Sequence, residues 1–132
     1  MVQKISKELA KHRLEQAKED LEAGKLLYDK NFYKSANNRA YYSCFHAIDA
    51  VLALEPKAFK KHKDTLAYFN KNYVHTGVFS RDIGRKVSKL EIIRHKSDYD
   101  QFYIASKEEA QEQTEVARLV VEEVEKYISS KL

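Results

Sequence analysis

An arginine and a histidine stand seven residues apart in the segment NNRAYYSCFHA, which runs from Asn37 to Ala47. A helical step of seven residues returns to within about 20° of its start and rises about 10 Å, so Arg39 and His46 lie in line on one helix face. Histidine exchanges protons near neutral pH, and arginine holds a phosphate through parallel hydrogen bonds while staying charged. The pair suits metal-independent cleavage of RNA, in which the 2′-hydroxyl attacks, His46 moves a proton and Arg39 stabilises charge on phosphorus.

The same spacing also arises by chance at a helix interface, where an arginine and a histidine simply satisfy polar groups. If the pair is chemical, Asp49 lies about one turn beyond His46 and is expected to orient the imidazole, and Tyr42 lies between Arg39 and His46. A single Arg–His pair has only one proton-transferring side chain, whereas the reaction needs a general acid and a general base. A second copy of the pair, related by a two-fold axis, would supply both.

The helix that carries this pair has no ordinary solvent face, because Asp49 is the only formal charge between Ala40 and Leu54. One side is an apolar core stripe, and the opposite side carries small residues beside the polar ones. We therefore expect Ser43, Ala50 and Ala53 to form a surface that meets a second copy, so that a bulky charge at Ala50 would yield monomers.

Length and composition predict a single all-helical domain over residues 1–132, because one proline and three glycines leave little turn chemistry for hairpins. Cys44 has no partner for a disulfide, and no apolar run is long enough to span a membrane. The charged N-terminus is unlike a signal peptide. Together these features predict a cytoplasmic protein. Residues 57–100 hold eleven Lys and Arg against five Asp and Glu, which is weak evidence for a polyanionic partner such as RNA.

The apolar spacing predicts a four-to-five-helix bundle, up-and-down in its main part. Helices are expected at about 6–29, 32–54 (stopped by Pro56), 80–96 and 106–129, with a short helix around Leu66, Phe69 and Tyr73 and a break at Thr76-Gly77. Residues 97–100 are typical of a helix end or turn, and Ser106 with Glu109 forms a capping box.

The other histidines, among them His62 in a lysine-rich loop, show no spacing typical of zinc sites, so we expect no metal and no cofactor. Arg94 and Asp98, one helical turn apart, indicate first an intrahelical ion pair.

The segment from Asn38 to Ala47 resembles the second-helix signature of HEPN domains, in particular the small stand-alone prokaryotic kind. The resemblance continues through Lys61-His62-Lys63, Val74-His75-Thr76-Gly77 and Arg94-x-x-x-Asp98-Tyr99 to the last, acidic helix, and thus covers nearly the whole chain.

This resemblance implies a homodimer of all-α bundles with an Arg-x(4–6)-His ribonuclease motif at the dimer cleft, and Arg39 and His46 enclose six residues. It implies a toxin or defence role and a minimal nucleotidyltransferase antitoxin as partner. In one branch that partner modifies a tyrosine two residues after the histidine, where this chain has Ile48. The auxiliary or substrate-binding candidates of the site are Asn38, Tyr42, Asp49, Arg94, Asp98 and Tyr99.

Three hypotheses follow from the sequence. The first is a homodimeric ribonuclease in which Arg39 and His46 are catalytic. The second is a non-catalytic module that docks a nucleotidyltransferase or binds a nucleotide, with His46 only a structural residue. The third is a helical dimer in which neither residue matters beyond packing.

Overall fold

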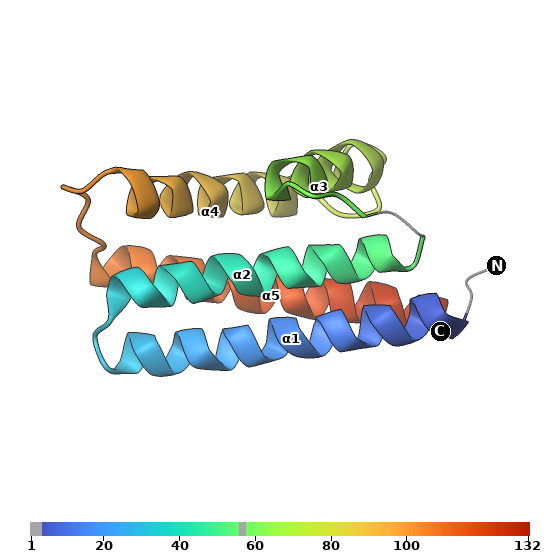
Figure 1. The fold of residues 1–132 in the computed structure, drawn as a ribbon, viewed down its shortest axis with the longest axis horizontal. Helices are drawn as coiled ribbons and strands as arrows, with labels where there is room; N and C mark the ends of the chain where they lie inside the picture. Colours follow the sequence, from blue (N-terminus) through green and yellow to red (C-terminus); the bar gives the residue numbers. More distant parts are fainter. Residues whose placement is uncertain (1–3, 56–57) are drawn as a thin grey trace.

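The computed structural model describes residues 4–55 and 58–132, and within them all regular secondary structure is helical (Figure 1). The elements are α1 (Lys4–Asp29), α2 (Tyr33–Ala53), α3 (His62–Phe69), the π-helical turn η1 (Asn70–Val74), α4 (Arg81–Tyr99) and α5 (Lys107–Lys131). The predicted all-helical class is confirmed. Pro56, the expected stop of the second helix, lies outside the described residues.

Four long helices alternate in direction along the chain, as in an up-and-down bundle (Figure 1). Helix α2 is central: it packs on α1, α4 and α5, and the short α3 contacts it beside α4. The turn from α1 into α2 passes through Asn31, whose φ of 68° is a left-handed conformation that asparagine tolerates well. The central position of α2 explains why its sequence lacks an ordinary charged face.

The small residues of α2 pack against α1 within one chain. Ser43 and Ala50 are fully buried, and the Ser43 hydroxyl donates a hydrogen bond of 2.7 Å to the carbonyl of Ala17. Ala53 is buried as well. The expectation that Ser43, Ala50 and Ala53 form a surface for a second copy is therefore wrong, because small side chains allow two helices to approach closely and the approaching helix here is α1.

Side-chain caps begin the last two helices. The Ser80 hydroxyl accepts from the backbone N–H of Ile83 at 3.2 Å, and the Ser106 hydroxyl accepts from that of Glu109 at 3.0 Å. The Glu109 carboxylate does not complete the capping box but accepts from the Asn37 amide at 3.4 Å. Residues 97–100, expected to form a helix end or turn, are the end of α4: the helix runs to Tyr99 and the chain leaves it at Asp100.

The break at Thr76-Gly77 is confirmed, because Gly77 has a φ of 84° and joins η1 to the segment that leads into α4. None of the helices in the described ranges is long and apolar enough to cross a membrane.

Candidate active site

The partly exposed residues in the middle of α2 form one stripe along the helix. They are Asn38, Arg39, Tyr42, His46 and Asp49, while the residues between them are buried. Spacings of three and four residues place these side chains on one side of the helix. The face of α2 opposite the apolar core stripe therefore has two parts in the structure. Its small residues are buried under α1, and its polar residues form this open stripe.

Asp20 of α1 joins the arginine and the histidine. One carboxylate oxygen lies 3.1 Å from an Arg39 guanidinium nitrogen, and the other lies 2.7 Å from Nδ1 of His46. The side chain of Asp20 is only 15% exposed. A buried carboxylate needs such partners, so the three side chains form one unit in which Asp20 fixes the positions of the other two.

The contact with Asp20 selects the tautomer of His46. A carboxylate only accepts hydrogen bonds, so Nδ1 of His46 carries the proton that it donates to Asp20. In the neutral ring Nε2 then holds the free lone pair, and no hydrogen bond to Nε2 occurs within residues 4–55 and 58–132. The imidazole is 27% exposed, so Nε2 is placed to accept a proton from a bound molecule.

Arg39 is held from several directions but keeps an exposed edge. Its second terminal nitrogen donates to the amide oxygen of Asn38 at 3.1 Å, and its guanidinium carbon lies 5.1 Å from the centre of the Tyr42 ring. Gly24 of α1 lies beneath it, because a β-carbon built there would be 3.4 Å from that of Arg39. The side chain of Arg39 is 38% exposed, which leaves N–H groups for an anion.

Asp49 does not orient His46, contrary to expectation. Its carboxylate forms an ion pair with Arg13 of α1, and Nδ1 of His46 is already taken by Asp20. Asp49 therefore links α1 to α2 one turn away from the site.

The predicted residues of α4 separate into two groups. Arg94 reaches the site, where a terminal nitrogen donates to the Tyr42 hydroxyl at 3.4 Å, and Asp98 lies 3.6 Å from that nitrogen, in the predicted intrahelical pairing. Tyr99 does not reach it: the residue is 76% exposed, and its ring packs on His95 with ring centres 4.7 Å apart.

His62, the first residue of α3, joins the site although its sequence context did not indicate this. Its ring stacks on Phe45 with centres 3.8 Å apart and lies edge-on to Tyr42 at 5.8 Å. Nδ1 of His62 is 3.3 Å from the Tyr41 hydroxyl. Burial, together with the positive charge of Arg94 and the neighbouring His46, lowers the pKa of His62, so this imidazole is neutral at pH 7.

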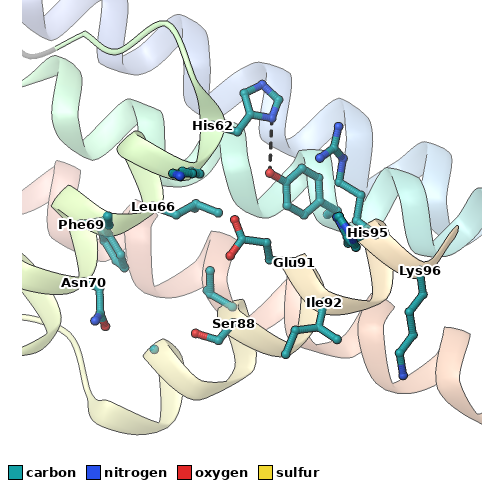
Figure 2. Close-up of a pocket in the computed structure, with 15 residues that line it drawn as sticks. His62, Leu66, Phe69, Asn70, Ser88, Glu91, Ile92, His95 and Lys96 are labelled. Carbon is teal, nitrogen blue, oxygen red and sulfur yellow. Dashed lines mark hydrogen bonds between the residues drawn. The ribbon is translucent and has the colours of Figure 1, made fainter. Parts of the chain in front are cut away.

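A groove of about 730 Å³ opens beside this site, between α3 with η1 on one side and α4 on the other (Figure 2). Tyr41, His62 and Arg94 belong both to the groove and to the surroundings of Tyr42. The groove floor includes Leu66 and Phe69, and polar side chains of Asn70, Ser88 and Glu91 line it. A hollow of this size and mixed polarity is typical of ligand sites.

In the described part of the chain no cluster of His, Cys, Asp and Glu side chains is arranged to hold a metal ion. Cys44 is buried, and burial raises the pKa of its thiol, so this cysteine stays protonated and unreactive.

Residues 10–127 match the model of the HEPN domain family. A protein of Methanocaldococcus jannaschii with the name "Putative toxin MJ0142" is 30% identical over 118 residues, which cover 89% of this chain and 80% of the relative. A UPF0332 protein of Thermotoga maritima is 30% identical over 112 residues, covering 85% of each chain. A second M. jannaschii protein, named "Putative toxin MJ0605", is 35% identical over 86 residues, which cover 65% of this chain and 64% of the relative.

Proposed function

Because this chain belongs to the HEPN domain family, we propose that it is a metal-independent endoribonuclease of the toxin or defence type, with Arg39 and His46 as catalytic residues. The single observation that carries the proposal is the bridge by Asp20, which holds both side chains on one open stripe of α2. The names of the M. jannaschii relatives support the toxin role.

In the proposed reaction the 2′-oxygen of a ribose attacks the adjacent phosphorus and the bond from phosphorus to the 5′-oxygen breaks. Nε2 of His46 takes the proton of the 2′-hydroxyl, and Asp20 stabilises the imidazolium that forms. Arg39 donates hydrogen bonds to the charged phosphorane. The products are a 2′,3′-cyclic phosphate and a 5′-hydroxyl, and the 5′-oxygen needs a proton from a second group.

We propose that a second copy of the chain supplies that proton through its own His46. The surface that would meet the copy is the open stripe with Arg39, Tyr42 and His46, since the small-residue side of α2 is covered by α1. Two copies of the Arg39 and His46 pair, facing each other, would provide one histidine as the base and the other as the acid. The two histidines would exchange these roles when the RNA binds in the reverse orientation.

A binding module without catalysis is the second candidate, and one contact favours it. The Asp20 carboxylate neutralises much of the Arg39 charge, as it would in a structural ion pair. In this hypothesis the module docks a minimal nucleotidyltransferase or holds a nucleotide. Modification two residues after His46 does not fit this chain, because Ile48 is fully buried and has no hydroxyl.

Growth of a bacterial host that expresses the chain separates the two candidates. Wild type should inhibit growth, and His46→Ala should relieve the inhibition at equal protein level, because the base is lost. A His75→Ala variant is the matched control, because His75 is exposed and its side chain contacts Asn70 rather than the residues of the Asp20 bridge. Equal inhibition by wild type and His46→Ala would contradict the ribonuclease and favour the binding module.

A further inference from the structure

A second cationic group lies next to Tyr42, on the α4 side of α2. The guanidinium carbon of Arg94 is 5.7 Å from the centre of the Tyr42 ring and 4.9 Å from that of Tyr41. Arg39, which is held toward α1, is 5.1 Å from the same Tyr42 ring. One tyrosine ring therefore adjoins two arginines from different helices.

The positive charge of Arg94 is less neutralised than that of Arg39. Arg39 is within hydrogen-bond distance of a largely buried carboxylate, whereas the acidic partner of Arg94 is the more exposed Asp98, at 3.6 Å. The Nε–H of Arg94 is buried and has no hydrogen-bond partner among the residues that the structure describes. Of the two arginines beside Tyr42, Arg94 thus has the charge that a carboxylate compensates less.

His62 presents a hydrogen-bond donor beside Arg94. The buried Tyr41 hydroxyl has no other acceptor in the described residues, so its O–H donates to Nδ1 of His62. Burial raises the pKa of Tyr41 to about 12, which keeps this hydroxyl protonated. With Nδ1 accepting, a neutral His62 carries its proton on Nε2. His62 and His46 therefore adopt opposite tautomers, one with a donor and one with an acceptor at Nε2.

Resting on the proposed function, we propose that Arg94 and His62 form a second phosphate subsite, which holds the phosphate next to the scissile one in a single-stranded RNA. The two arginines adjoin one ring, so one strand can contact both while it crosses Tyr42. Lys63 and Lys96 also line the groove behind the subsite, against a single carboxylate there, that of Glu91.

The groove is the reason to expect a single-stranded RNA rather than a duplex at the proposed subsite. His62 and Arg94 line the groove, and Tyr41, Leu66 and Phe69 give it apolar surface, as Figure 2 shows for Leu66 and Phe69. An unstacked base can enter such a hollow, whereas a base inside a duplex stays covered by its neighbours.

The test compares dinucleotide substrates that carry one phosphate with the same dinucleotides bearing an added 5′- or 3′-phosphate. In wild type, one of the added phosphates should lower KM by about tenfold, the value of one good charge-assisted contact. In Arg94→Gln that gain should disappear, so that KM is the same with and without the added phosphate. Arg94→Lys should retain part of the gain, and Lys126→Gln, which removes one exposed cation of α5, should retain all of it.

Two substitutions at His62 separate hydrogen bonding from packing. Gln places an N–H near the position of Nε2, so His62→Gln should keep most of the KM gain, whereas His62→Phe keeps a ring on Phe45 and should lose it. If Phe retains the gain as well as Gln does, His62 does not contact phosphate and the subsite is wrong.

Anisotropy with a labelled, uncleavable deoxyoligonucleotide gives a readout independent of cleavage. The slope of log affinity against log salt should fall by about one in Arg94→Gln but not in Arg94→Lys. If wild type does not cleave RNA but its salt slope still exceeds that of Arg94→Gln by about one, the subsite is supported and the ribonuclease is overturned. Cleavage with unchanged KM and an unchanged salt slope in Arg94→Gln would overturn the subsite and leave the ribonuclease standing.

Discussion

Asp20 lies 2.7 Å from His46, although the two residues are 26 positions apart and belong to different helices. This contact makes α1 part of the site, because it fixes which imidazole nitrogen is free. The same carboxylate holds Arg39, so one change at Asp20 alters both the base and the cation.

We expect Asp20→Asn to lower kcat for RNA cleavage by about 10²–10⁴-fold, as loss of the orienting carboxylate does in other acid–base sites. An amide N–H facing Nδ1 favours the tautomer with the proton on Nε2, where the base is needed. RNA binding should tighten slightly, because Arg39 is no longer neutralised. Single-turnover kinetics and binding measured in parallel test this, with exposed Glu19→Gln as the control. An unchanged kcat would show that Asp20 has only a structural role.

Substitution of Ala50 by Glu should unfold the chain rather than separate a dimer. The side chain is fully buried under α1, and an unpaired carboxylate there costs more than about 3 kcal/mol. Circular dichroism melts and light scattering would distinguish the two results. A folded monomer with a native melting curve would restore Ala50 to an interface between copies.

The two helical glycines should respond oppositely to alanine. A β-carbon at Gly84 would lie 2.9 Å from a methyl carbon of Val74, whereas one at Gly24 would be 3.4 Å from that of Arg39. Alanine gains about 1 kcal/mol of helix propensity at either position. Gly24→Ala should therefore be neutral or stabilising, and Gly84→Ala should be destabilising by about 1–2 kcal/mol. Urea unfolding of both variants checks this, and equal effects would contradict the packing around Gly84.

Acid should weaken the fold partly through His62. Because burial and the neighbouring charges of Arg94 and His46 lower the pKa of His62, the unfolded chain binds its proton more readily than the folded one. The stability contributed by neutral His62 is thus complete above about pH 6.5 and declines as the pH falls below it. Urea melts at pH 7.5 and 5.5 should show a smaller loss for His62→Gln than for wild type. A larger loss in the variant would mean that the folded state favours the protonated ring.

Most of the fold follows from local patterns. The apolar spacing, the Ser80 and Ser106 caps and the left-handed Gly77 mark the helix ends within a few residues. The small residues of α2 correctly indicated close helix packing, but they carry no information on whether the other helix belongs to the same chain or to a second copy.

The sequence predicted the arginine and the histidine of the site but not their partners Asp20 and His62. Arg39 and His46 share one helix, so their spacing reveals the pair. Asp20 stands in a charged segment beside Glu19 and Glu22, and only the register between α1 and α2 distinguishes it from them. His62 reaches the site because α3 folds back onto α2, a tertiary contact that its lysine-rich surroundings do not encode.

The most direct test is cleavage of an end-labelled RNA pool in EDTA by purified wild type and His46→Ala, with the product ends identified. We expect wild type to leave 2′,3′-cyclic phosphates and 5′-hydroxyls, and His46→Ala, equally folded, to lose this activity. Products with 3′-hydroxyl ends, a requirement for added metal, or full activity of His46→Ala would contradict the proposed chemistry at the bridge of Asp20, Arg39 and His46.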